Sequence, residues 1–384
     1  MLNTTSTTSS SSRFLFVDLL RGWAVVVMIE THVINALLNS SLREGSFFAV
    51  LNFINGLVAP SFLFCAGFAL AISLHRRWES YIHLERPFWR YLVRLGFILI
   101  VGYSLHLPFF SFRRMRELTD GEAWSSFFQV DILQVIAVTL LALVCLAILA
   151  RKKERWVWIS SLAAAAVILV SPMAWELDFS GLPIWLRPFL TTSVKTQFPL
   201  FPWAAFLISG TVIGSWFVKA KETEKERPLM KRLPVLAAAG IGIAILFAVL
   251  PINFYANQNF WGPSPEFFLV RLGFVVLGLT GFWWYERLFK PSSKSLASIF
   301  GQESLLVYVV HLLIVYGQDY DWSLVRAYGQ TLSHADCFIV FLLLTGAMFV
   351  LANVWHRLKA WNKQISNVVQ FAVLGVLFLR FLTR

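Results

Sequence analysis

Long apolar stretches separated by short polar loops run along almost the whole chain. They lie at residues 14–38, 47–74, 91–109, 126–150, 156–175, 198–218, 233–251, 266–286, 297–317, 336–356 and 366–382. A helix needs roughly 20 mostly apolar residues to cross a membrane, and in lipid it satisfies its own backbone hydrogen bonds. The segments lack the period-two alternation of a membrane β-barrel. The pattern predicts an all-α, polytopic transmembrane helical bundle of about 11 spans, with the ninth segment as one of the clearest.

The composition leaves no room for a separate soluble domain. Hydrophobic residues make up 58% of the chain and charged residues 14%, whereas soluble domains are about 25% charged. We therefore expect residues 13–384 to form a single transmembrane domain. Residues 1–12 are rich in Ser and Thr, which predicts a disordered tail, and the charged helix after them is expected to be retained rather than cleaved.

The basic residues indicate how the chain is oriented. The formal net charge is +12, but Lys and Arg occur in short clusters between apolar segments, which is typical of topology signals and lipid contacts and not of a nucleic-acid surface. Every second loop is rich in Lys and Arg, although the loop with Arg113, Arg114 and Arg116 departs from this alternation. The pattern predicts a multi-pass protein of the cell inner membrane, with a cytoplasmic N-terminus and an external C-terminus.

The first apolar segment carries four ionisable residues, Asp18, Arg21, Glu30 and His32. Such residues are costly inside a membrane and usually mark a site. On a helix Asp18 and Arg21 can pair, while Arg21 and His32 share a face about 16.5 Å apart along the axis. This stripe predicts that Arg21 binds phosphates of a cytoplasmic donor and that His32 meets the donor's reactive end. Alternatively, Asp18 and Arg21 anchor the helix end and His32 bonds within the bundle.

Two later segments also contain polar groups at membrane depth. His311 shares one helical stripe with Ser304 and Tyr308, and Asp131 lies one turn before Gln134. His311 is a candidate for the acceptor side of a site, and Asp131 is a candidate for orienting a histidine or the acceptor. Hydrogen bonding between helices is the structural alternative for both.

Further residues add a phosphate contact and packing surfaces. Arg94 lies at the predicted cytoplasmic end of its segment and could bind phosphate, whereas Arg271 is external and could contact an acceptor or lipid headgroups; both could also be snorkelling anchors. Gly210 and Gly214 form a small-residue packing face. The sequence has no phosphate-binding loop, no nucleophile elbow and no His/Cys cluster with metal-ligand spacing, so we expect no metal and no permanently bound cofactor.

Four stretches in order along the chain resemble the heparan-α-glucosaminide N-acetyltransferase catalytic-domain family. They are VDLLRGWAVVVMIETH, VAPSFLFCAGFALAISL, FPLFPWAAFLISGTVIG and GQESLLVYVVHLLIVYG. The resemblance implies transfer of an acetyl group from cytoplasmic acetyl-CoA to a sugar on the far side of the membrane. The spacing of Arg21 and His32 is also similar to the first-helix pattern of the acyltransferase-3 family. The lysosomal family member has its proposed active histidine in the loop after the first helix, and here residues 39–46 contain none.

These observations predict a membrane acyltransferase that uses acetyl-CoA or another acyl-CoA. Arg21, with its neighbour Asp18 and with Arg94, would form the donor site. His32 would deprotonate a hydroxyl or amine of a sugar or glycan acceptor, or carry the acyl group, and Asp131 or Glu30 would orient it. Membrane lipids and another copy of the chain are possible further partners.

Two other classes of function fit part of this pattern. In a proton-coupled transporter or permease the same charges would form a solute pathway, although the two halves of the chain show no repeat. A degenerate family member would only bind a lipid or a partner.

Overall fold

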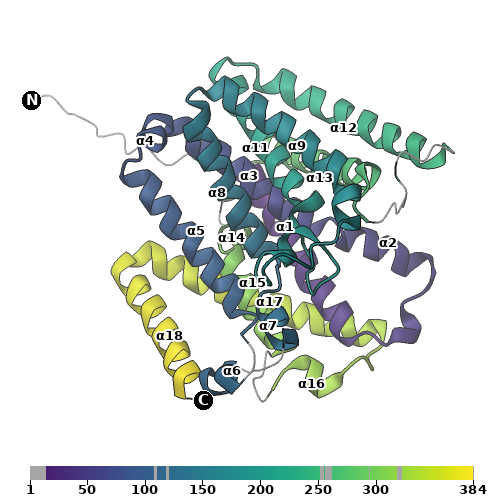
Figure 1. Ribbon diagram of the computed structural model, residues 1–384, viewed down its shortest axis with the longest axis vertical. Helices are drawn as coiled ribbons and strands as arrows, with labels where there is room; N and C mark the ends of the chain where they lie inside the picture. The colour runs from purple at the N-terminus through teal and green to yellow at the C-terminus, as the bar shows by residue number, and fades with distance from the viewer. Residues whose placement is uncertain are drawn as a thin grey trace, which may run out of the picture.

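The computed structural model describes residues 14–107, 110–117, 121–250, 255, 262–293, 295–317 and 322–383. The predicted disordered tail lies outside the described residues. The named secondary-structure elements are all helices, and they pack side by side into a bundle (Figure 1). The all-α, polytopic fold is confirmed.

The longer helices coincide with the predicted apolar segments, whereas several short helices lie in the loops between them. The longer ones are α1 (Leu15–Leu37), α3 (Val58–Arg76), α5 (Arg86–Ser104), α8 (Ile132–Ala150), α9 (Lys153–Glu176), α11 (Leu200–Glu222), α12 (Glu226–Val249), α13 (Pro265–Phe289), α17 (His334–Trp361) and α18 (Lys363–Thr383). The shorter ones are η1 (Ser40–Leu42), α2 (Gly45–Asn55), α4 (Trp78–Ile82), α6 (Phe112–Glu117), α7 (Gly121–Phe127), α10 (Arg187–Leu190), α14 (Leu296–Gln302), α15 (Ser304–Tyr316) and α16 (Leu324–Tyr328).

Fewer helices than predicted meet a strict requirement of length and apolar character. In the described ranges 8 helices do so, counting α2 with α3 as one, and the bent pair of α14 and α15 brings the number to 9. Two further long helices, α1 and α5, are not among them. Each carries three charged residues near or within its apolar stretch, namely Asp18, Arg21 and Glu30 in α1, and Arg86, Arg90 and Arg94 in α5. The predicted number of about 11 spans is therefore not confirmed.

α1, which carries Asp18, Arg21 and Glu30, lies inside the bundle. α1 packs against α3, α13, α14, α15 and α17, and more than half of its residues are buried. By contrast, α12 and α18 lie at opposite edges of the bundle (Figure 1) and bury few residues. The exposed residues of α12 and α18 include many large apolar side chains, whereas the charged residues of α1 are surrounded by other helices.

Glycines bring α3 and α11 into close contact. A Cβ atom added at Gly210 would overlap the Phe64 carbonyl, and one added at Gly67 would overlap the Leu207 carbonyl. Gly214 faces Phe68 in the same interface. The predicted packing role of Gly210 and Gly214 is confirmed.

The ninth segment is not one straight helix. α14 and α15 meet at Glu303 with a bend of 88°. The Glu303 side chain is buried, and its carboxylate accepts hydrogen bonds from Lys359 at 2.5 Å and from His356 at 3.1 Å, both near the end of α17. A buried carboxylate is costly without partners. His356 and Lys359 supply these partners to Glu303, and their contacts stabilise the bend between α14 and α15.

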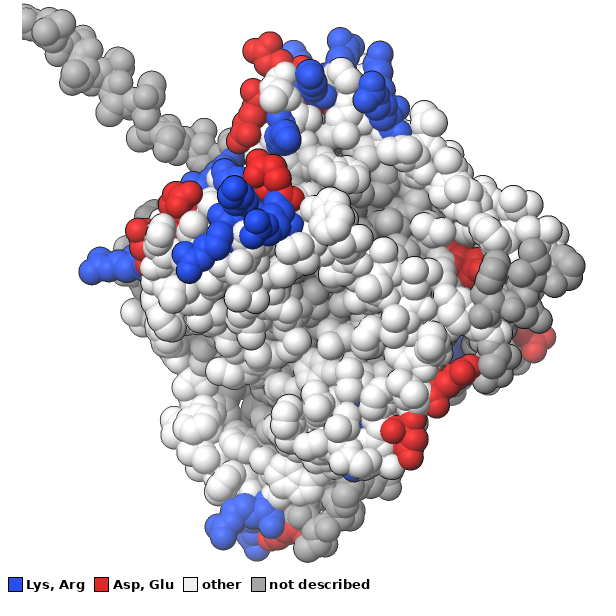
Figure 2. All heavy atoms as spheres, turned by 45° about the horizontal axis from the view of Figure 1, so that its top comes forward, with Lys and Arg blue, Asp and Glu red and all other residues white. Residues whose placement is uncertain are grey.

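The loops are sorted between the two ends of the bundle as the charge alternation predicts. Three hydrogen bonds join predicted cytoplasmic ends, namely Phe16 N to Glu286 Oε2, Lys153 Nζ to the His75 carbonyl and Arg287 to Glu226. Two others join predicted external loops, namely Gln197 N to the Val130 carbonyl and Leu332 N to the Leu37 carbonyl. On the face drawn in Figure 2, Lys and Arg gather mainly at the top of the view, and a broad uncharged surface lies below them.

Candidate functional site

A cavity of about 540 Å³ lies towards the predicted cytoplasmic end. It is lined by residues of α1, α3, α5, α8 and α15, and it includes four arginines: Arg21, Arg77, Arg90 and Arg94. None of the described residues that line it is acidic. We call it the basic cavity. Four guanidinium groups without a lining carboxylate make it suited to a ligand with several negative charges.

Arg21 is held in place by the backbone of two other helices. Its guanidinium donates to the carbonyl of Gly301 at 3.4 Å and to that of Cys65 at 3.3 Å. Asp18 lies 3.8 Å from it, is buried and does not line the basic cavity. The predicted pairing of Asp18 with Arg21 is confirmed, and it positions Arg21 rather than presenting a carboxylate to the ligand. Arg94, on α5, reaches the same cavity.

A second cavity, of about 430 Å³, lies towards the other end. Its lining includes His32, His106, Asp131 and Arg271, together with the amide side chains of Asn35, Asn55 and Gln197. We call it the histidine cavity. It combines groups able to move protons with groups able to hydrogen-bond a polar ligand.

The two cavities adjoin at a shared set of residues, which we call the partition. Phe62, Ile132 and Tyr308 line both of them. Arg21 lies on one side of this partition and His32 on the other. These three residues therefore mark where the two cavities adjoin.

His32 and His311 lie close together but have different surroundings. Their ring centroids are 5.1 Å apart, and His32 Nδ1 is 3.2 Å from the Tyr316 hydroxyl. His311 is fully buried, its Nδ1 is 2.7 Å from the Val307 carbonyl, and it is absent from the lining of both cavities. It therefore packs beside His32, and its place on the acceptor side stays a prediction. Glu30 also lines neither cavity.

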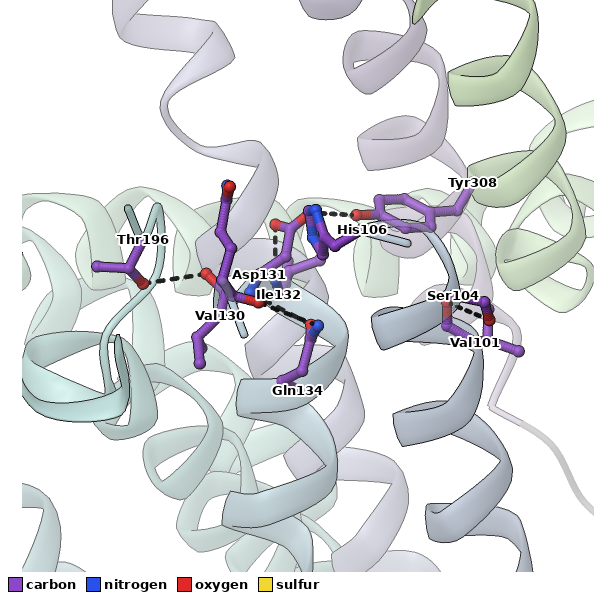
Figure 3. A network of polar contacts seen from close by, with 10 residues as sticks. Val101, Ser104, His106, Val130, Asp131, Ile132, Gln134, Thr196 and Tyr308 are labelled. Carbon is purple, nitrogen blue, oxygen red and sulfur yellow. Dashed lines mark hydrogen bonds and ion pairs between the residues drawn. The ribbon is translucent and has the colours of Figure 1, made fainter. Parts of the chain in front are cut away.

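Asp131 caps a helix with one carboxylate oxygen and contacts two side chains from other elements with the other oxygen. It caps α8, where its Oδ1 accepts from Ile132 N at 2.7 Å and its N–H donates to Gln134 at 3.2 Å. Its Oδ2 accepts from the Tyr308 hydroxyl at 3.0 Å and lies 3.8 Å from His106 Nε2. Figure 3 shows Tyr308 and His106 pointing towards this carboxylate. The histidine beside Asp131 is thus His106, not His32.

Sequence reasoning missed His106. The residue lies near the predicted external end of the apolar segment 91–109, where an ionisable side chain was itself a signal. It stands alone in that segment, however, and its partners Asp131 and Tyr308 come from other helices. No spacing within one helix could connect the three.

The described residues thus form a helical membrane bundle with a basic cavity and an adjacent histidine cavity. Residues 13–249, more than half of the chain, match the model of the family described as heparan-alpha-glucosaminide N-acetyltransferase, catalytic. The chain belongs to this family of membrane acetyltransferases. A comparison with curated proteins gives no match. The matched range includes Arg21, His32 and Asp131 but ends before Tyr308 and His311.

Proposed function

We propose that this protein transfers an acetyl or related acyl group from cytoplasmic acyl-CoA to a sugar or glycan on the external side of the cell inner membrane. The observation that carries the proposal is the pair of cavities that adjoin at the partition. One is suited to a polyanionic donor and the other to a polar acceptor. Only the acyl group has to pass the partition.

The basic cavity supports an acyl-CoA donor by its charge and its shape. Guanidinium groups bind phosphate oxygens through several hydrogen bonds at once, and Arg21, Arg77, Arg90 and Arg94 supply them. The rest of the lining is mostly apolar and fits the uncharged arm that carries the thioester. Arg21 and His32 are about 16.5 Å apart along α1, comparable with the length of that arm.

The histidine cavity supports a sugar acceptor. Three amide side chains, those of Asn35, Asn55 and Gln197, offer both donors and acceptors to hydroxyl groups. Arg271 is buried in the wall, where it hydrogen-bonds the Gly56 carbonyl and lies 4.2 Å from the centre of the Phe267 ring. In our proposal His32 stands at the acyl carbonyl, and the acceptor lies between it and these polar groups.

Purified protein in detergent should bind acetyl-CoA and transfer radiolabelled acetyl groups to at least one of three acceptors: glucosamine, glucose or a total membrane-glycan fraction. The same protein in sealed vesicles should not accumulate these solutes under a proton gradient. Solute uptake without acetyl-CoA binding would contradict the proposal and would instead indicate a transporter. Acetyl-CoA binding with no transfer to any acceptor would leave only a binding protein.

Reporter fusions test the orientation on which the proposal depends. A reporter fused after Lys153 should be active on the cytoplasmic side, and one fused after Lys195 on the external side, because the loops containing these residues differ in their Lys and Arg content. Alkaline phosphatase and a fluorescent protein would give opposite signals at each site. Both fusions on the same side would exclude the sidedness proposed for the donor.

A further inference from the structure

The histidine cavity contains a second imidazole that is not on α1. His106 lies in the turn that follows α5, where its backbone N–H donates to the Tyr103 carbonyl at 3.0 Å. Its side chain lines the cavity and is 16% exposed. The Nε2 atom is buried, has no hydrogen bond among the described residues and lies 3.8 Å from Asp131 Oδ2.

The carboxylate beside His106 is fixed from two directions. Ile132 N holds Oδ1 at 2.7 Å, and the Tyr308 hydroxyl holds Oδ2 at 3.0 Å (Figure 3). Ile132 and Tyr308 also form part of the partition. The pair of His106 and Asp131 therefore stands where an acyl group coming from the basic cavity would enter.

We infer that His106, supported by Asp131, is the general base that takes the proton of the acceptor, an inference that rests on the proposed function. With Nε2 turned to Asp131, the proton-accepting atom is Nδ1, which none of the described residues hydrogen-bonds. The 3.8 Å separation is longer than a hydrogen bond, and such contacts often shorten when substrates bind.

The step balances in atoms and charge. The acceptor O–H or N–H bond breaks as its proton moves to His106 Nδ1, and the acceptor atom forms a bond to the acyl carbon. The thioester C–S bond then breaks, and the CoA thiolate leaves through the basic cavity and is protonated by cytoplasmic water. His106 returns its proton to water on the external side.

His106 is better placed for this role than His32 because of its charged neighbour. An imidazolium at His106 would face the Asp131 carboxylate, which stabilises it. His32 has no carboxylate partner among the described residues, and another imidazole, that of His311, lies beside it. His32 is thus left to act at the acyl carbonyl, while Asp131 is a positioning residue for His106.

Two substitutions test the pair in the full-length protein. His106→Asn and Asp131→Asn should each lower kcat for acetyl transfer by about 10²- to 10⁴-fold, with the affinity for acetyl-CoA unchanged. Asparagine caps a helix as well as aspartate does, so Asp131→Asn keeps the start of α8. The double variant should be little worse than either single one, because the two residues act as a unit.

Two controls separate chemistry from folding. His83 and Glu79 form a similar pair at 3.6 Å on the exposed surface, and His83→Asn should transfer acetyl groups at the wild-type rate. His106→Gly should regain turnover when free imidazole is added, which a purely structural role would not allow. If His106→Asn does not fold, Asp131→Asn and the rescued His106→Gly decide the question.

Wild-type turnover by folded His106→Asn, or by Asp131→Asn, would overturn the inference while leaving the proposed function intact. A rise in KM without a fall in kcat would also overturn it, since that result describes a binding residue. If the wild-type protein binds acetyl-CoA but transfers to none of the three acceptors, the proposed function fails and the inference fails with it.

Discussion

Replacing His32 by alanine should remove most acetyl transfer, by about 10²- to 10³-fold, because in our proposal His32 acts at the acyl carbonyl; the affinity for acetyl-CoA should stay largely unchanged. His32 lines the histidine cavity, and the arginines that we assign to the donor line the other cavity. The substitution therefore removes a group at the acyl end without changing the phosphate contacts. Radiolabelled acetyl transfer and calorimetric titration with acetyl-CoA measure the two effects separately.

His311 and His334 provide the comparison for His32. His311→Ala should lower the thermal stability of the bundle and reduce the rate less, because His311 is fully buried beside His32. His334→Ala should change neither quantity, because His334 is exposed at the start of α17. Near-normal transfer by His32→Ala, together with an inactive but folded His311→Ala, would reverse the assignment.

Arg21→Ala should weaken acetyl-CoA binding about 10- to 100-fold, which corresponds to the loss of charge-assisted hydrogen bonds worth about 1.5–3 kcal/mol. Arg21→Lys should restore part of the affinity, since an ammonium keeps the charge but not the planar array of donors. Substitution of Arg94 should have a smaller effect because that side chain is exposed. Calorimetry of each purified variant gives the affinities.

Arg113 is the matched control for Arg21. It is exposed and pairs with Glu117 at 3.4 Å, outside the basic cavity. Arg113→Ala should bind acetyl-CoA like the wild-type protein. Because Arg21 also bonds the Gly301 and Cys65 carbonyls, size-exclusion profiles must show that Arg21→Ala is folded. Unchanged affinity in folded Arg21→Ala would exclude the phosphate role.

The features that the sequence predicts well are those set within one segment. The helices follow the apolar stretches because length and hydropathy are local properties. The stripe from Arg21 to His32 is likewise fixed by the geometry of one helix, and the structure places its two ends at different cavities. The packing of Gly210 against α3 also follows from a short local pattern.

The features that could not be predicted depend on residues far apart in the chain. The bend at Glu303 is coupled to Lys359 and His356, more than 50 residues later. The site around Asp131 combines His106 from the turn after α5 with Tyr308 from α15. A single sequence gives the polarity of each residue but not which helices become neighbours.

Under the proposed function, the partition also sets where the membrane voltage acts. With the cavities open to opposite sides, as proposed, water and ions on each side carry the potential inwards to Phe62, Ile132 and Tyr308. Nearly the whole voltage then falls across these side chains. Moving one elementary charge through them would change the free energy by about 2.3 kcal/mol per 100 mV. The acyl group is neutral and the charged CoA stays on the cytoplasmic side, but the proposed step releases a proton on the external side and takes one from the cytoplasm. Each turnover therefore moves one positive charge outwards, and a membrane potential that is negative inside should oppose the transfer.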